Sequence, residues 1–278
     1  MAVKIVNIDD MDFSADPRDR DETVKDFRKE VTILQQLKDS KARNVNLIHD
    51  AFDLHSQLWI ISDYCTGGSV RTLMRANPMS GLEEKFIIPI ARELAVAMKC
   101  VHDIGVIHRD IKCTNVYVTE EGQIQLGDFG IVGIMDDSTS NKRTTIIGTP
   151  WYMPREMHVD SPSVAGGYGT EVDIWAFGCT VYEMATGLVP NARVAPNMLA
   201  SVLEEQAPRL VGGEYSDGLR DFVAFCLESD PRARPSADQI IMHPYIANTS
   251  MQYPTVSLVE LIERYTVCLL YTSDAADE

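Results

Sequence analysis

The stretch HRDIKCTN at residues 108–115, followed by DFG at residues 128–130, decides the expected fold. Asp128 comes thirteen residues after Asn115, and the residues between them have the pattern of a strand, a turn and a second strand. Asp110, Asn115 and Asp128 carry oxygen atoms of the kind that accept a proton or hold a hard cation. The alternative is that HRD and DFG are chance tripeptides in ordinary turns. Their order and separation argue against that alternative.

These residue types fit phosphoryl transfer. That reaction needs metal ions held against the phosphates, a carboxylate aimed at the attacking hydroxyl, and a cation over the transferred group. Asp110 can accept the hydroxyl proton, and Lys112, two residues further on, can reach a γ-phosphate. Asn115 and Asp128 supply the oxygen ligands that Mg²⁺ prefers.

From residue 1 to about residue 246, the chain resembles the eukaryotic protein kinase family. Ala2-Val3-Lys4 is similar to the end of the family's VAIK strand, which implies that Lys4 binds the α- and β-phosphates of ATP. Glu30 is three residues after Phe27 and four before Leu34, on one apolar helix face. The resemblance implies that Glu30 pairs with Lys4. Without the downstream motifs, a solvated lysine and a surface glutamate would be the simpler interpretation.

Three further motifs follow in the family's order: GTPWYM at 148–153, DIWAFG at 173–178 and DPRARP at 230–235. The family's APE motif reads PRE here, at residues 154–156. The resemblance implies that Glu156 pairs with Arg234, and that the DIWAFG helix anchors the catalytic loop. Arg155 stands where the family has proline, which puts the local turn geometry in question but not the chemistry.

At two motif positions, the chain carries residue types that resemble those of serine/threonine kinases rather than tyrosine kinases. They are Lys112 in the catalytic loop and Thr149 in GTP. The strings LWIISDYC at 58–65 and KRTTIIGTPWYM at 142–153 are most similar to the sterile-20-like, or germinal-centre, kinase group.

The string at 58–65 also locates the expected adenine site. The resemblance implies that Asp63 and Cys65 present backbone groups to adenine. Ser62 then occupies the gatekeeper position, where the family usually carries a larger residue; the alternative is a one-residue error in this register. Tyr117, in the strand after the catalytic loop, is assigned to the same nucleotide site.

The run KRTT at 142–145 lies between DFG and GTP, where the family's activation loop is modified. Thr145 is the first candidate for phosphorylation and Thr144 the second, by an upstream kinase or by autophosphorylation in trans. A phosphate adds about −1.5 to −2 charge, with which Arg109 can pair. The alternative is two solvated threonines.

Strands early in the chain and helices later predict a small sheet-bearing part followed by a mostly helical part, and the resemblance implies an α+β, bilobal, protein-kinase-like fold. We expect a small antiparallel-sheet lobe and the start of the hinge over residues 1–64, and a mostly helical lobe over residues 65–246. Residues 247–267 predict an extension helix, and residues 268–278 resemble a translated sequencing adapter, the alternative being a natural polar tail. The family has a Gly-rich hairpin before the VAIK lysine, so the first two strands are expected to be missing.

Within the first lobe, residues 9–22 are charged and turn-rich and predict an exposed loop. A helix is expected after this loop, because apolar residues recur at steps of three and four from Val24 to Leu37.

Composition excludes several classes of protein. Lys plus Arg number 25 and Asp plus Glu 41, giving a formal net charge of −16, whereas nucleic-acid binding needs a basic surface. No apolar run approaches the roughly 20 residues of a membrane span. The N-terminal residues are too short a run and too acidic to be a signal peptide. The six cysteines form no CxxC pair, which predicts reduced thiols in a cytoplasmic protein. The six histidines have no zinc-ligand spacing.

We therefore expect a cytoplasmic serine/threonine protein kinase that uses ATP and Mg²⁺ to phosphorylate Ser and Thr hydroxyls of protein substrates, in a signalling cascade. The alternative is a pseudokinase scaffold, or a kinase-fold fragment that is inactive without the Gly-rich hairpin. The complete catalytic set favours the enzyme: Lys4, Glu30, Asp110, Asn115 and Asp128. A small-molecule phosphotransferase is disfavoured, because such chains generally lack the GTPxWM and DPxxRP motifs.

Overall fold

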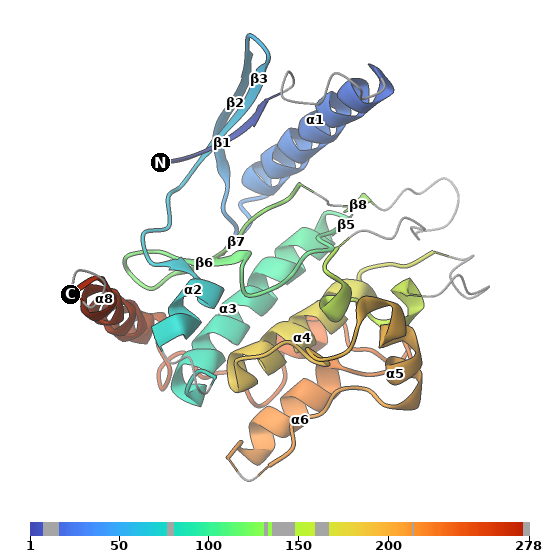
Figure 1. The fold of residues 1–278 in the computed structure, drawn as a ribbon, viewed down its shortest axis with the longest axis vertical. Helices are drawn as coiled ribbons and strands as arrows, with labels where there is room; N and C mark the ends of the chain where they lie inside the picture. The colour runs from blue at the N-terminus through green and yellow to red at the C-terminus, as the bar shows by residue number, and fades with distance from the viewer. Residues whose placement is uncertain are drawn as a thin grey trace.

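A small sheet with one long helix lies above a larger, mostly helical part (Figure 1). The computed structural model describes residues 1–7, 17–76, 81–130, 133–134, 148–158, 167–212 and 214–274. This arrangement confirms the sheet-bearing and helical parts expected from the order of strands and helices, and the α+β, kinase-like fold that the resemblance implies.

The N-terminal sheet is antiparallel, with strand order β1-β3-β2. Its strands are β1 (Ala2–Asn7), β2 (Ile48–Leu54) and β3 (Gln57–Ser62). Lys4 of β1 lies opposite Ile60 of β3. Directly opposed residues share one face of a sheet, so Lys4 and the buried Ile60 point to the same side. The side chain of Lys4 is thereby directed toward the helix that packs on that side.

That helix, α1 (Pro17–Asp39), begins earlier than the sequence interpretation placed it. The prediction of an exposed loop over residues 9–22 is therefore wrong for residues 17–22, because these residues already belong to the helix. Proline fits the first helical position, since its fixed φ suits a helix and its missing N–H needs no partner there. The apolar face expected between Val24 and Leu37 does pack inward, with Leu34 and Leu37 buried.

The C-terminal part contains the helices α2 (Val70–Leu73), α3 (Glu84–Asp103), α4 (Glu171–Thr186), α5 (Leu199–Glu205), α6 (Asp217–Cys226), α7 (Ala237–Ile241) and α8 (Leu258–Asp274). Its 3-10 turns are η1 (Met74–Ala76), η2 (Pro150–Tyr152), η3 (Arg155–Met157), η5 (Pro196–Met198) and η6 (Thr255–Ser257). In the described part of the chain, no helix has the length and apolar character of a membrane span.

Short strands lie between the two parts of the molecule. The strands β4 (Gly68–Ser69), β6 (Val116–Val118) and β7 (Ile124–Leu126) form a second antiparallel sheet in that spatial order. The strands β5 (Val106–Ile107) and β8 (Gly133–Ile134) pair separately. The motifs HRDIKCTN and DFG follow β5 and β7 directly, so these short strands fix where both motifs lie.

The extension helix expected over residues 247–267 is only partly helical. Residues 247–254 form turns and coil, and α8 starts at Leu258 and runs to Asp274. Pro254 accounts for the difference, because the residue before a proline is disfavoured in the helical conformation.

The helical part is held together by a core centred on α4 and α6. Phe177 and Phe222 are both fully buried, and their rings meet edge to face with centroids 5.9 Å apart. We predict that Phe222→Ala lowers the free energy of unfolding by about 3–5 kcal/mol, because it leaves a cavity in a packed core. Phe225→Ala, on the same helix but 36% exposed, is the control. Urea unfolding measures both; equal losses would contradict this account of the core.

Candidate active site

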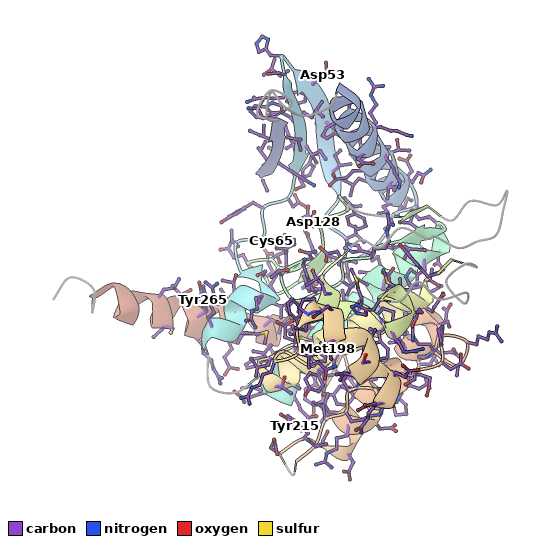
Figure 2. All side chains as sticks on the ribbon, turned by 45° about the vertical axis from the view of Figure 1, so that its right-hand side comes forward. Asp53, Cys65, Asp128, Met198, Tyr215 and Tyr265 are labelled. Carbon is purple, nitrogen blue, oxygen red and sulfur yellow. The ribbon has the colours of Figure 1, made fainter. Side chains whose placement is uncertain are left out.

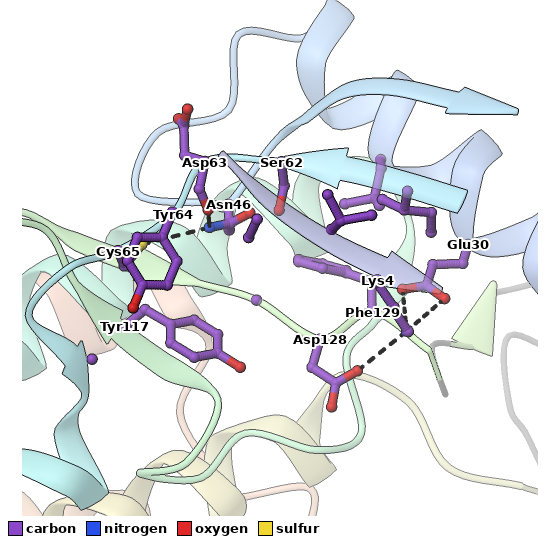
Figure 3. A pocket seen from close by; sticks show the side chains of 16 residues that line it. Lys4, Glu30, Asn46, Ser62, Asp63, Tyr64, Cys65, Tyr117, Asp128 and Phe129 are labelled. Atoms are coloured by element: carbon purple, nitrogen blue, oxygen red, sulfur yellow. Dashed lines mark hydrogen bonds and ion pairs between the residues drawn. The ribbon is translucent and has the colours of Figure 1, made fainter. Parts of the chain in front are cut away.

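A cavity of about 550 Å³ lies where the two parts of the molecule meet (Figure 3). Figure 2 shows Cys65 and Asp128 at this junction. Five of the six residues predicted to bind the nucleotide and its metal line the cavity, and the sixth, Asn115, does not: the five are Lys4, Asp63, Cys65, Tyr117 and Asp128. They come from β1, from the segment after β3, from β6 and from the segment after β7, so the fold brings together residues that are far apart in the chain.

One end of the cavity is charged. Lys4 Nζ lies 2.8 Å from Glu30 Oε1, 3.0 Å from Glu30 Oε2 and 3.6 Å from Asp128 Oδ1 (Figure 3). The contact between Lys4 and Glu30 that the resemblance implies is thus present. Glu30 is buried, and a buried carboxylate is tolerated only beside a compensating cation. A Cβ at Gly130 would lie 3.2 Å from Lys4 Nζ, so the glycine of DFG leaves room for this ammonium group.

The other end is formed by the segment after β3. The side chain of Asn46 donates to the backbone oxygen of Asp63 at 3.1 Å and to Gln125 Oε1 at 2.9 Å. The Asp63 carbonyl was expected to accept from adenine, and its second lone pair remains for that purpose. Burial raises the pKa of the Cys65 thiol, which keeps it protonated. Asn46 was missed by the sequence interpretation, because no local pattern relates it to Asp63.

The carboxylate of Asp110 is held by three side chains. Lys112 Nζ lies 2.8 Å from Asp110 Oδ2, Asn115 Nδ2 donates to the same oxygen at 2.9 Å, and the Thr149 hydroxyl donates to Oδ1 at 3.1 Å. Lys112 also donates to Thr149 Oγ1 at 2.9 Å. From the sequence we expected Lys112 to reach a γ-phosphate. In the structure its ammonium group contacts Asp110 and Thr149 instead. The contact between Thr149 and Asp110 was not predicted.

The donor atoms near the cavity fit a hard cation. Because Asn115 turns its amide nitrogen to Asp110, its carbonyl oxygen is the atom left to bind a cation. Asp128, which lines the cavity, has a side chain 47% exposed. Among the described residues, no three or more His, Cys, Asp or Glu side chains form a group that could hold a metal ion by themselves. Two oxygen ligands fit Mg²⁺, which usually keeps several waters and binds one or two protein groups together with phosphates.

The loop that carries Asp110 is anchored by Asp173, at the start of α4. Asp173 Oδ2 accepts from the backbone N–H of His108 at 2.8 Å, and Oδ1 accepts from that of Arg109 at 2.7 Å. The His102 ring lies 2.8 Å from Oδ2. Burial opposes ionisation, but the hydrogen bonds and charges around it still lower the pKa of Asp173. The anchoring role expected for the DIWAFG helix thus has a specific contact.

His108 joins the same loop to the apolar core. Its ring is fully buried and meets Phe129 edge-on at 4.8 Å, and burial lowers its pKa. Leu34 and Ile48 are buried in the same apolar core as Phe129.

The segment after GTPWYM contains the second expected ion pair. Arg234 Nη1 lies 2.7 Å from Glu156 Oε1, with the Arg234 side chain fully buried. Arg155, the departure from the family's proline, lies in a 3-10 turn and pairs with Glu204 of α5 at 2.8 Å. The departure therefore leaves the Glu156 contact intact.

The guanidinium of Arg109 lies beside Tyr168. Its Nη1 donates to the Tyr168 hydroxyl at 3.2 Å. Its Nε is buried and has no hydrogen-bond partner among the described residues. Thr144 and Thr145, the predicted phosphorylation sites, lie outside the described residues.

We predict that Asp173→Asn lowers the free energy of unfolding at neutral pH by about 2–4 kcal/mol, because a buried charge-assisted network is lost. The pKa of Asp173 is lower in the folded than in the unfolded chain. Its stabilisation is therefore complete above the unfolded value, about 3.9, and is lost as the pH falls through the folded value. Urea unfolding across acidic pH measures the difference, with the exposed Asp53→Asn as control. A difference that stays constant in acid would contradict the role of the charge.

Comparison with known proteins identifies the family. Residues 1–246 match the protein kinase domain. The chain is 39% identical to the serine/threonine-protein kinase KIC1 of Saccharomyces cerevisiae, over 95% of this chain and 23% of that protein. It is 32% identical to sporulation-specific protein 1 of the same yeast, over 98% of this chain and 52% of that protein. It is also 32% identical to the serine/threonine-protein kinase dst1 of Dictyostelium discoideum, over 95% of this chain and 33% of that protein.

The chain thus spans only 23% to 52% of the length of these three relatives. The two strings predicted the sterile-20-like kinase group. This prediction is confirmed, because the relatives of the chain are kinases of that group. The chain belongs to the protein kinase family.

Proposed function

We propose that this chain transfers the γ-phosphate of ATP to serine and threonine hydroxyls of protein substrates. The observation that carries the proposal is the arrangement around Asp110, whose carboxylate is oriented by Lys112, Asn115 and Thr149. A carboxylate fixed in this way can accept the proton of an attacking hydroxyl.

The roles of the cavity residues follow from their positions. Lys4, held by Glu30, would bind the α- and β-phosphates. Asp63 and Cys65 would offer backbone groups to adenine, and the ring of Tyr117 would contact the base from the opposite side. Gly127 lies against that ring, since a Cβ there would come within 2.8 Å of Tyr117 Cε2.

Asn115 and Asp128 would hold Mg²⁺, which neutralises phosphate charge when bound. Asp128 has a φ of 61°, in the left-handed region that non-glycine residues seldom adopt. Backbone strain of this kind concentrates at functional sites, where the surrounding structure maintains it. Here the strain directs the carboxylate of Asp128 toward the cavity and Lys4.

Thr149 and Lys112 support serine and threonine as acceptors. Both contact the carboxylate of Asp110, so they define the space in which the acceptor hydroxyl must lie. We further propose a cytoplasmic location and a role in a signalling cascade. In the described part of the chain, Cys65, Cys100, Cys113, Cys179 and Cys226 form no disulfide, as expected in a reducing compartment.

We predict that Asp110→Asn lowers the rate of phosphate transfer to a generic serine/threonine protein substrate by at least about 10²-fold, because the proton acceptor is lost. Asp103→Asn, an exposed aspartate at the end of α3, is the matched control and should keep the full rate. Transfer from radiolabelled ATP in the presence of Mg²⁺ is the measurement. Full activity of Asp110→Asn, or no transfer by the unsubstituted chain, would overturn the proposal.

A second prediction concerns activation, for which we propose Thr145, and next Thr144, as phosphorylation sites. Support comes from the buried, unpartnered Nε of Arg109, which can donate to a phosphate. Thr145→Ala should lower kcat/KM by about tenfold or more, since a hydrogen bond to a charged group contributes about 1.5–3 kcal/mol. Mass spectrometry of active protein and kinetics of both single alanine variants provide the test. Active protein with neither threonine phosphorylated would contradict it.

A further inference from the structure

The segment of residues 249–264, which we call the C-terminal brace, packs against α3 (Figure 1). Arg92 of α3 donates to Thr249 Oγ1 at 3.1 Å and to the backbone oxygen of Tyr253 at 2.9 Å. Leu258 and Leu261, in the first turns of α8, are buried. The brace is therefore part of the packed structure.

Charged residues add a second layer to this contact. Arg264 of α8 lies 2.6 Å from Glu83, just before α3, and its guanidinium is 5.3 Å from the ring centroid of Phe86. Lys85 pairs with Glu260 at 3.1 Å. Exposed pairs of this kind contribute little individually, so the buried leucines dominate the attachment. The ion pairs fix the direction in which α8 leaves the core.

The brace contacts the small sheet β4-β6-β7 at its first strand. A Cβ at Gly67 would lie 2.7 Å from Ile262 Cδ1 and 2.7 Å from the backbone oxygen of Val118. Gly67 is therefore enclosed between α8 and β6. The next residue, Gly68, lines the cavity and pairs with Val118. In Figure 2, Tyr265 marks α8 beside α2, which follows this strand.

The brace also contacts the same sheet at the turn between β6 and β7. A Cβ at Gly122 would lie 2.5 Å from the backbone oxygen of Thr255, and Gln123 Nε2 donates to Thr255 Oγ1 at 3.2 Å. Gly122 has a φ of 79°, which the turn requires. Tyr117, at the centre of β6, lines the cavity between these two contacts.

We infer that the C-terminal brace fixes the sheet β4-β6-β7 and thereby positions Gly68 and Tyr117 for the nucleotide, with Ile262 as a positioning residue. This inference rests on the proposed function, which places ATP in the cavity. Its physical basis is that a binding site is only as rigid as the side chains that support its lining residues. Ile262 acts through Gly67, which directly precedes the lining residue Gly68.

The test compares Ile262→Ala with Ile262→Val, and with Val256→Ala as control. Val256 lies in the same segment but is 61% exposed. Isothermal titration with Mg-ADP should give a Kd at least about fivefold higher for Ile262→Ala, a typical coupling between remote sites. Ile262→Val removes the Cδ1 atom that lies nearest to Gly67 and should therefore also raise the Kd, whereas Val256→Ala should bind as the unsubstituted chain does.

Hydrogen exchange without nucleotide tests the brace separately. Amides in residues 65–73 and 114–119 should exchange faster in Ile262→Ala, while those of α4 should not change. Unchanged exchange in the small sheet, or unchanged Mg-ADP affinity in a chain that binds Mg-ADP, overturns the inference. If the unsubstituted chain binds no Mg-ADP, the proposed function fails, and the exchange result alone decides whether the brace fixes the sheet.

Discussion

The buried carboxylate of Asp173 is the interaction on which the candidate active site depends. It accepts hydrogen bonds from the backbone N–H groups of His108 and Arg109, at 2.8 and 2.7 Å. Arg109 has a φ of 67°, a left-handed conformation that costs free energy in any residue except glycine. The two charge-assisted hydrogen bonds offset that cost. Because Asp110 is the next residue, the direction of its carboxylate follows from this anchor, and the contacts of Lys112 and Thr149 then refine it.

A second constraint joins the two parts of the molecule through one lysine. Lys4 contacts Glu30 of α1 and, more distantly, Asp128 after β7. Glu30 is buried and needs a cation, while Asp128 is half exposed. The position of α1 therefore determines where the ammonium group lies relative to DFG. Any displacement of α1 from the sheet would separate Lys4 from Glu30 and leave an uncompensated buried charge, which is the costly state.

The motif residues could be predicted from the sequence because they lie in short local strings. The Lys4–Glu30 pair was predicted from the resemblance to the protein kinase family, and helical periodicity only placed Glu30 on the inward face. The hydrogen bonds of Asn46 with Asp63 and of Thr149 with Asp110 could not be predicted from the sequence. They join distant segments of the chain through side chains that belong to no recognisable pattern for these contacts. Two boundaries were also wrong: α1 starts at Pro17, and the extension becomes helical only after Pro254. In both cases the local effect of proline outweighed the composition of the surrounding residues.

We propose that the catalytic loop held by Asp173, together with Asp128 and the segment after β3, surrounds one site for a nucleotide and its metal ion. The most direct measurement is a crystal structure with Mn²⁺ in place of Mg²⁺ and a non-hydrolysable ATP analogue, with the metal located by its anomalous scattering. We expect the metal ion to bind the side-chain oxygens of Asn115 and Asp128, and the purine to lie beside Asp63 and Cys65. Metal bound elsewhere, or a purine outside the cavity that Tyr117 lines, would contradict it.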